Sequence, residues 1–348
     1  MIAAGIAAGT HTPEDQAVDS RAVADPGPVL EAAEAGQFAA TVDAAVAAIG
    51  RAVVGKPDAV RLALICLLSE GHLLLEDVPG TGKTTLAKSL AAVVGGTTSR
   101  IQFTPDLLPS DVTGVTIWDQ SVGSFVFHPG PVFASVVLAD EINRASPKTQ
   151  SALLEVMEES AVTVDGVTRP VGSPFMVIGT QNPVEQAGTY RLPEAQLDRF
   201  QIRTSVGHPD EDAAVAILAA VGTRAGRPEV GPLLTPAEVG DLIEQASRVY
   251  VDTSILRYIT QLVAATRAVD GVTLGVSQRG AIALLRTART LAASRGRHFV
   301  VPDDVKSLAE PVLAHRICID PEAEYGGLTA ADVVAAVLRT VPPPRGAA

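Results

Sequence analysis

The chain has 348 residues, which is long enough for two domains with a full hydrophobic core. Hydrophobic residues make up 47% and charged residues 19%, a composition typical of globular proteins and not of disordered chains. The formal net charge of -12 and the pI near 5.0 disfavour a non-specific nucleic-acid binder, although a local basic channel is compatible with them.

The sequence carries no sign of a membrane or export segment. No apolar stretch approaches the length of a membrane span, and the apolar residues 1–9 lack the basic flank of a signal peptide. The two cysteines, Cys66 and Cys318, lie far apart in apolar surroundings, which is typical of small buried side chains in a reducing compartment. We therefore expect a cytoplasmic protein.

Residues 1–37 are rich in Ala, Gly, Pro and acidic residues, and we expect them to form a flexible arm. Residues 38–205 alternate short apolar runs with helical patterns. This pattern predicts an α/β domain around a central parallel sheet.

A phosphate-binding loop is predicted directly after the apolar run at 73–75. The chain reads DVPGTGKTT from Asp77 to Thr85, and helix-spaced apolar residues follow up to Val94. The two glycines let backbone N–H groups converge on one anion, the lysine adds a positive charge, and the threonine after it offers a hydroxyl ligand for Mg²⁺. The usual first glycine is replaced by Asp77. The residues expected to contact the nucleotide here are Pro79, Gly80, Thr81, Gly82, Lys83, Thr84 and Thr85.

Two segments have the pattern of exposed β-hairpins. Alternating residues from Val115 to Phe127 flank a turn at 120–123, and those from Val162 to Val171 flank Asp165-Gly166, a strong two-residue turn signal. An ordinary extension of the sheet is the alternative interpretation. Neither tip is strongly basic, which disfavours the threading of DNA.

Polar side chains follow two further apolar runs, as expected for a ligand site at the carboxyl edge of a parallel sheet. Asp140 and Glu141 directly follow residues 136–139, and Asn182 comes shortly after residues 175–178. We expect Asp140 to hold Mg²⁺, Glu141 to polarise the attacking water, and Asn182 to orient that water. A turn role for Asn182, which precedes a proline, is the alternative.

Residues 206–340 change to helical patterns and predict a small helical lid domain. Thr235–Glu238 is a helix start with a capping box, and Val301–Asp304 is a weaker one. We expect residues 341–348 to form a flexible tail.

With these motifs the chain resembles the MoxR family of AAA+ ATPases, from about Phe38 to about Ile319. Besides the phosphate loop and the carboxylate pair, the resemblance is carried by FTPDLLPSD at 103–111, DEINRA at 140–145, GTYRLPEAQ at 188–196, LDRF at 197–200 and SQR at 277–279. It implies an AAA+ nucleotide-binding domain followed by a lid. It also places the first hairpin inside helix 2 and the second just before the third apolar strand.

The resemblance implies a role for each candidate site residue. Lys83 and Thr84 correspond to Walker A, Asp140 and Glu141 to Walker B, Asn182 to sensor 1, Arg199 to an arginine finger acting on a neighbour's nucleotide, Arg279 to sensor 2, and Val54 and Gly55 to the adenine-binding backbone. Thr84 and Asp140 are the implied metal ligands. An exposed ion pair is the alternative for Arg199, and an ordinary solvated side chain for Arg279. The sequence does not rank Arg144 and Lys148, which could also face a neighbouring subunit.

These observations together predict an ATPase that uses ATP and Mg²⁺ and assembles as a ring, with a hexamer as the expected size. The expected output is chaperone-like remodelling or maturation of a protein partner, and the family resemblance implies a partner with a von Willebrand factor A domain. A nucleic-acid translocase is one alternative, disfavoured by the acidic charge. A nucleotide-switched adaptor is another, disfavoured by the intact Glu141, Asn182 and Arg199.

Overall fold

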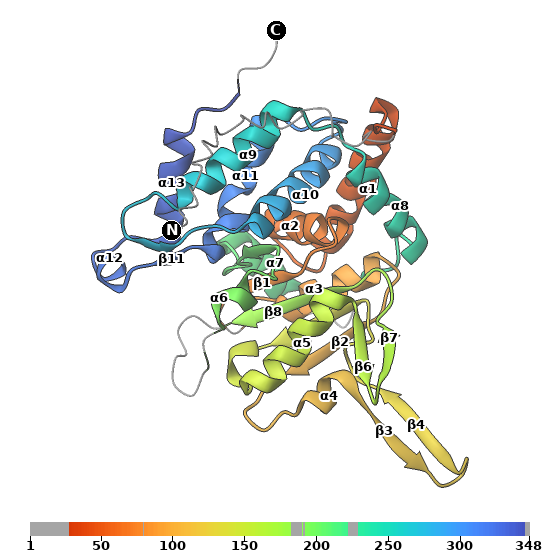
Figure 1. Ribbon diagram of the computed structural model, residues 1–348. Helices are drawn as coiled ribbons and strands as arrows, with labels where there is room; N and C mark the ends of the chain where they lie inside the picture. The colour runs from red at the N-terminus through yellow and green to blue at the C-terminus, as the bar shows by residue number, and fades with distance from the viewer. Residues whose placement is uncertain (1–27, 79, 182–189, 191, 222–228, 345–348) are drawn as a thin grey trace, which may run out of the picture.

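The computed structural model describes residues 28–78, 80–181, 190, 192–221 and 229–344. In this part of the chain five strands form one parallel sheet (Figure 1). They are β1 (Leu73–Glu76), β2 (Thr98–Gln102), β5 (Val136–Asp140), β8 (Met176–Gln181) and β9 (Ile202–Thr204). Their spatial order is β2-β5-β8-β1-β9, so β1 lies between β8 and β9. The predicted parallel sheet is thus confirmed, and its three apolar runs are its three central strands.

Both faces of the sheet are covered, which explains why its strands read as continuous apolar runs. Leu73 and Leu75 pack into a core on one face, with helix α3 (Lys83–Val93). Leu74 points the other way and packs with Leu153 of helix α5 (Pro147–Glu159). Alternate side chains of one strand therefore serve two cores, as the period of two requires.

The two predicted hairpins are confirmed. The first is β3 (Gly114–Asp119) with β4 (Ser124–Pro129), and the second is β6 (Ala161–Val164) with β7 (Val167–Pro170). Asp165 and Gly166 both have positive φ, 52° and 74°, as a type I′ turn requires. The first hairpin follows the short helix α4 (Pro109–Thr113), but residues 130–135 after it form turns and bends. It therefore lies between a helix and a loop and does not interrupt a longer helix.

The first hairpin projects from the body, at the end opposite the lid helices (Figure 1). At its base the Phe127 ring lies under the Arg169 guanidinium of the second hairpin, 4.0 Å from the ring centre. Arg169 also donates to the carbonyls of Val164 and Val167, next to its own turn. Nearer the tip of the first hairpin, Trp118 and Phe125 form an edge-on pair and are 53% and 70% exposed.

The C-terminal part of the described chain is a helical lid, as predicted. The capping box at Thr235 is present, because its hydroxyl accepts from Glu238 N at 3.3 Å. The strand pair of β10 (Val272–Leu274) with β11 (Cys318–Ile319) was not foreseen. Val215 and Leu218, predicted on an apolar helix face, are 60% and 73% exposed. In the predicted lid range of 206–340 the described elements are α7 (Glu211–Val221), α8 (Pro236–Ser247), α9 (Thr253–Thr266), β10, α10 (Gln278–Ser294), α11 (Pro302–Leu313), η2 (Ala314–Arg316), β11, α12 (Pro321–Tyr325) and α13 (Ala330–Thr340).

The N-terminal helices pack against this lid. They are α1 (Ala32–Gly50) and α2 (Pro57–Leu68), and α1 lies beside α10 (Figure 1). Glu34 in the first turn of α1 forms an ion pair with Arg248 at 2.6 Å, and Leu30 is buried. Helix α1 therefore begins before residue 37, where the predicted arm ends, and a capping box and a lid contact hold its first turn. The predicted boundary between the two domains near residue 205 stays a prediction.

Candidate nucleotide-binding site

The loop after β1 and the ends of three neighbouring strands line one pocket of about 350 Å³. Gly80 and Gly82 have φ of 89° and 95°, a conformation that glycine adopts without strain. Gly82 is the residue before helix α3, so backbone N–H groups at the start of this helix face the pocket. The residues that line it are Gly80, Gly82, Lys83, Thr84, Arg100, Gln102, Asp140, Glu141 and Thr180.

Lys83 is held against its own loop. Its Nζ donates to the carbonyl oxygens of Asp77 and Val78 at 3.0 and 3.1 Å. Both acceptors are neutral, and a phosphate oxygen is a stronger partner for an ammonium group. The lysine is therefore placed to bind a nucleotide phosphate at the mouth of the loop.

The structure explains why the usual first glycine is an aspartate. Asp77 is 5% exposed, and its carboxylate accepts hydrogen bonds from Val206 N at 2.7 Å and Gly207 N at 2.9 Å. These two residues begin the connection from β9 to the lid. Asp77 thus ties the phosphate loop to the chain that leads into the lid.

The predicted adenine-binding backbone lies beside the same connection. Gly55 has φ of 75°, and a Cβ there would come 2.7 Å from Cβ of Ala213. Lys56 Nζ donates to the carbonyl oxygen of His208 at 2.6 Å. Val54 and Gly55 do not line the phosphate pocket, so their role toward the base stays a prediction.

Asp140 and Glu141 are joined through a hydroxyl of the adjacent strand. The buried Thr180 hydroxyl donates to Asp140 Oδ1 at 2.6 Å and accepts from Glu141 N at 2.9 Å. Glu141 has a φ of 57°, which is uncommon for a residue with a side chain and is frequent at functional sites. The neighbouring strand thus fixes where the two carboxylates point.

Two side chains of β2 bind these carboxylates, one by an ion pair and one by a hydrogen bond. Arg100 forms an ion pair with Asp140 Oδ2 at 2.5 Å, and Gln102 Nε2 donates to Glu141 Oε2 at 3.0 Å. Arg144 also binds Glu141, at 2.9 Å, so one partner of this arginine is a carboxylate of its own chain. The Arg100 contact shows that Asp140 favours a cation, and with the Thr84 hydroxyl in the same pocket the donor set fits Mg²⁺.

Two of the other predicted nucleotide contacts, Thr81 and Thr85, do not line the phosphate pocket. Thr81 is buried and its hydroxyl lies 3.4 Å from the carbonyl of Val78, while Thr85 is in the first turn of α3. Pro79 and Asn182 lie outside the described residues, so their roles stay predictions.

Arg199 and Arg279 lie together, and neither lines the phosphate pocket. Arg199 follows helix α6 (Glu194–Leu197), and Arg279 is in the first turn of α10. Both form ion pairs with Glu158 near the end of α5, Arg199 at 2.6 Å. Burial raises the pKa of Glu158, but the two arginine charges outweigh this effect and hold it below its usual value. The three side chains line a second pocket, of about 490 Å³.

Sequence reasoning missed Arg100, Gln102, Thr180 and Glu158. Gln102 could have been found, because it ends a strand and the same carboxyl-edge argument led to Asp140. Thr180 lies on β8, two residues before the predicted Asn182 in the sequence. Glu158 has no sequence signal, since only the packing of α5 brings it to the two arginines.

Family models match most of the two predicted domains. Residues 72–202 match the model described as "ATPase family associated with various cellular activities (AAA)", and residues 264–337 match an AAA lid domain. In the described part of the chain, none of the helices combines the length and the apolar character needed to cross a membrane.

Curated relatives and a solved structure resemble the chain over most of its length. The chain is 47% identical to the uncharacterized protein YeaC of Bacillus subtilis, over 86% of this chain and 94% of YeaC. It is 41% identical to the chaperone MoxR1 of Mycobacterium tuberculosis, over 88% and 83% of the two chains, and 34% identical to the protein MoxR of Paracoccus denitrificans, over 80% and 89%. The crystal structure of a putative ATPase from Cytophaga hutchinsonii superposes with a TM-score of 0.84 at 37% identity, over 90% of this chain and 98% of that one.

The phosphate loop, the paired carboxylates at a strand end and the helical lid agree with these matches. The chain is therefore an ATP-binding AAA+ ATPase and belongs to the MoxR family.

Proposed function

We propose that this ATPase completes its catalytic site between two subunits of a ring, with a hexamer as the expected size. The observation that carries the proposal is the separation of the two arginines from the phosphate loop of their own chain. His72, which precedes β1, lies 2.9 Å from the carbonyl oxygen of Met157, next to Glu158. The phosphate loop follows the other end of β1, about 10 Å or more away along the strand.

Arg199 and Arg279 are thus at the amino edge of the sheet, whereas Lys83 and the carboxylates are at its carboxyl edge. A neighbour's nucleotide is the natural partner for a pair of guanidinium groups that cannot reach their own. Two guanidiniums can meet the negative charge that spreads over the γ-phosphoryl oxygens in the transition state.

At the carboxyl edge each residue has a task. Lys83 and the helix N-terminus would hold the phosphates, Thr84 and Asp140 would hold Mg²⁺, and Glu141 would take up the proton of the attacking water. Mg²⁺ would supply neutralisation of phosphate charge. Because Arg100 already binds Asp140 Oδ2, Arg100 and Mg²⁺ would compete for the same carboxylate.

The experiment that tests the shared site mixes two inactive proteins. Arg199→Ala or Arg279→Ala should bind ATP with unchanged affinity but hydrolyse it about 100-fold more slowly. Lys83→Ala keeps both arginines and loses the cradle, so a mixture should recover several-fold more activity than either protein alone. Subunit exchange is first shown by energy transfer between labelled subunits. Exchange without recovered hydrolysis would contradict the shared site.

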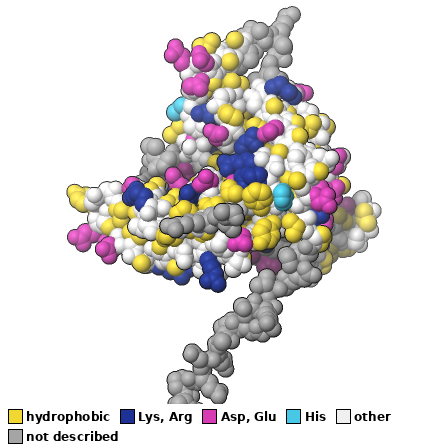
Figure 2. Space-filling model, turned by 90° about the horizontal axis from the view of Figure 1, so that it is seen from above, with side chains coloured by type: hydrophobic (Ala, Val, Ile, Leu, Met, Phe, Trp, Pro, Cys, Tyr) yellow, Lys and Arg dark blue, Asp and Glu magenta, His cyan; other side chains and the backbone are white. Residues whose placement is uncertain are grey.

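We further propose that the output is the remodelling of a protein partner, with a von Willebrand factor A domain protein as the expected partner. The relative named chaperone MoxR1 supports the first part. The projecting hairpins offer exposed apolar side chains, including Trp118 and Phe125, that a protein could contact. On the face shown in Figure 2, Lys and Arg gather in small groups among Asp and Glu, and no continuous basic track crosses it.

The output is tested with a trap and a hairpin variant. Glu141→Gln should hold ATP without turnover and retain its partner during purification from the native cell. A neutral turn in place of Val164–Val167 should leave basal hydrolysis nearly intact and abolish stimulation by that partner. Salt-sensitive stimulation of hydrolysis by DNA, lost in the hairpin variant, would instead support a nucleic-acid translocase.

A further inference from the structure

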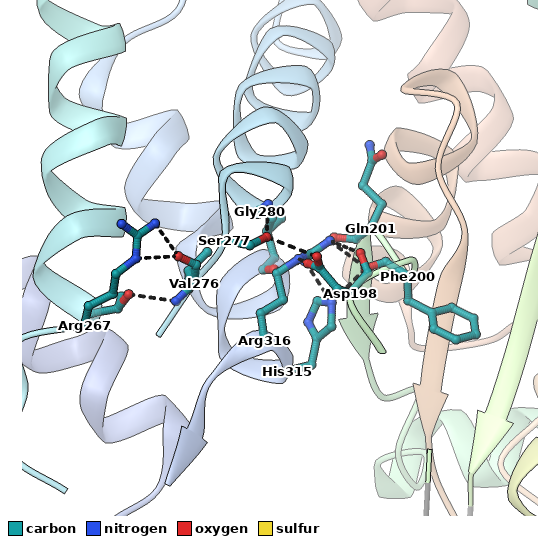
Figure 3. Close-up of polar contacts among 11 residues, drawn as sticks. Asp198, Phe200, Gln201, Arg267, Val276, Ser277, Gly280, His315 and Arg316 are labelled. Carbon is teal, nitrogen blue, oxygen red and sulfur yellow. Dashed lines mark hydrogen bonds and ion pairs between the residues drawn. The ribbon is translucent and has the colours of Figure 1, made fainter. Parts of the chain in front are cut away.

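A buried arginine of the lid reaches into the nucleotide-binding domain. Arg316 lies in η2, directly after α11, and is only 5% exposed (Figure 3). Its Nε donates to Asp198 Oδ1 at 2.7 Å. Burial lowers the pKa of Arg316, and the facing carboxylate opposes this effect. Arg316 lines the same pocket as Arg199 and Arg279, but all three of its nitrogens are engaged by protein groups.

Three of these contacts are to the backbone on both sides of Arg199, while Nη1 also donates to the carbonyl oxygen of Val312 in α11 and lies 2.8 Å from His315 Nε2. Arg316 Nη2 donates to the carbonyl oxygens of Asp198 and Phe200 at 3.2 and 2.8 Å, and Nη1 lies 3.4 Å from that of Gln201. The residue before Arg199 and the two after it are thus held by one planar, rigid group. The backbone that carries the Arg199 side chain is therefore held in place by a buried guanidinium group.

The other oxygen of Asp198 connects to the helix that carries Arg279. Ser277 Oγ donates to Asp198 Oδ2 at 3.0 Å, and Ser277 is the N-cap of α10, where its hydroxyl also accepts from Gly280 N. Arg279 lies in the first turn of that helix. One carboxylate therefore links the segments of both arginines (Figure 3).

The surrounding packing accommodates this arrangement closely. A Cβ on Gly280 would lie 2.9 Å from Cδ of Arg316 and 2.4 Å from Cγ1 of Val276. A glycine at this position therefore avoids a collision with the Arg316 side chain. Val276 is itself fixed, because its N–H donates to the buried Thr266 hydroxyl at 3.0 Å and its carbonyl accepts from Arg267 Nη2 at 2.8 Å.

We propose that Arg316 and Asp198 are positioning residues that hold Arg199 and Arg279 in one common orientation, so that the docked lid presents both arginines to the neighbouring subunit together. This inference rests on the proposed shared site. The inference gives the contact between the lid and the nucleotide-binding domain a part in hydrolysis. Neither Arg316 nor Asp198 would touch the nucleotide itself.

The principal test is Arg316→Met, which removes the guanidinium and keeps an unbranched apolar side chain. We expect ATP affinity within about twofold of wild type and a kcat at least about tenfold lower, because small displacements of catalytic groups are costly. The matched control is Arg297→Met, since Arg297 binds the fully buried Asp304 at 2.5 Å inside the lid and touches neither arginine. It should leave kcat within about twofold of wild type.

Two further readouts separate positioning from a general loss of stability. Arg316→Met should regain hydrolysis when mixed with Lys83→Ala, whose arginine segments are intact. Hydrogen exchange at the amides of residues 199–201 should become faster in Arg316→Met and stay unchanged in Arg297→Met. Arg316→Lys should show an intermediate kcat, because one ammonium can reach Asp198 but cannot span the three carbonyls.

If Arg316→Met does not fold, Ser277→Ala carries the test, with Thr235→Ala as the control that removes a helix N-cap elsewhere in the lid. The inference is supported if kcat falls in Ser277→Ala but not in Thr235→Ala, and if hydrolysis recovers when Ser277→Ala is mixed with Lys83→Ala. Normal kcat in folded Arg316→Met, or in Ser277→Ala where it replaces that variant, would overturn it. The inference would also be overturned if mixing with Lys83→Ala restored hydrolysis to Arg199→Ala but not to the tested variant. Failure to rescue Arg199→Ala itself would contradict the shared site instead.

Discussion

The two edges of the sheet are built in different ways. At the carboxyl edge, the loop at 77–84 and the ends of β2, β5 and β8 form the phosphate pocket, and each contributes side chains a few residues apart in the chain. At the amino edge, Glu158, Arg199 and Arg279 come from α5, the loop after α6 and the lid. Every residue of the carboxyl edge lies between 80 and 180, within the predicted nucleotide-binding domain, whereas the amino edge exists only once the lid has docked.

This difference separates two demands on the enzyme. Binding a nucleotide needs backbone N–H groups and a lysine in a fixed loop, which a short segment supplies. In the proposed shared site, presenting arginines to another subunit would need a rigid surface, and contacts between the two domains such as Arg316 with Asp198 would supply it. Mutations at the two edges should therefore change different measured quantities.

The largest expected effect is at the carboxyl edge. Lys83→Ala should weaken ATP binding at least about 100-fold, because it removes the ammonium that meets the phosphates, whereas Glu141→Gln should keep affinity and lower kcat at least about 100-fold. Calorimetric titration with ATP and steady-state hydrolysis separate the two. Lys88→Ala, at an exposed position of the same helix, is the control. Equal affinity in Lys83→Ala and wild type would contradict the assignment of the loop.

The same contrast explains what the sequence could predict. Apolar runs such as Leu73–Leu75 form strands because both faces of the sheet are covered. The residue types at Asp165-Gly166 predict a hairpin turn. Both signals lie within a few residues of the sequence. Glu158 and Arg316 were invisible because their partners are 41 or more and 118 residues away, and an isolated charge reads as a solvated surface residue.

Departures from a pattern were equally hard to interpret from sequence. Asp77 was recognised as a missing glycine, but its purpose depends on Val206 and Gly207, which lie 129 and 130 residues further along. The early start of α1 was missed because the Ala-rich segment before residue 37 has the composition of a linker, while its order comes from the contact of Glu34 with Arg248.

Asp77 also tests whether the carboxyl edge is independent of the lid. Asp77→Gly restores the usual loop pattern but leaves one buried and one partly buried N–H group unpaired, which should lower the free energy of unfolding by about 3 kcal/mol. Asp77→Asn keeps one oxygen acceptor and should lose about half as much. Urea denaturation measures both. Unchanged stability in Asp77→Gly would show that the loop and the lid connection are not coupled through this side chain.

The amino edge should respond to pH through His72. Burial lowers its pKa from 6.5 to about 4, and its ring is held neutral between the carbonyl of Met157 and the N–H of Val177. Between these two pKa values the unfolded chain binds a proton that the folded protein does not, so stability falls as pH falls. From pH 7 to pH 5 this loss is about 2 kcal/mol for one such histidine.

His72→Asn should remove that share of the loss while its amide oxygen can still accept from Val177 N. Part of the loss should remain, because burial also lowers the pKa of His315. Urea denaturation at pH 7, 6 and 5 gives the comparison, with His128→Asn in the exposed hairpin as the control. An unchanged pH dependence in His72→Asn would exclude this histidine as its source.

The smallest expected effect concerns Glu158, which binds both arginines with all three side chains between 27% and 47% exposed. Ion pairs this accessible contribute less than about 1 kcal/mol each, so Glu158→Gln should fold normally. In the proposed shared site the carboxylate would compete with a neighbour's phosphate for the same guanidiniums, so its removal should raise hydrolysis by at most about threefold at low subunit concentration. Glu159→Gln makes the same change of charge one residue away and should have no effect on hydrolysis. A fall in hydrolysis comparable to that of Arg199→Ala would mean that Glu158 holds the arginines in their active orientation, and the amino edge would then be preorganised by its own helix as well as by the lid.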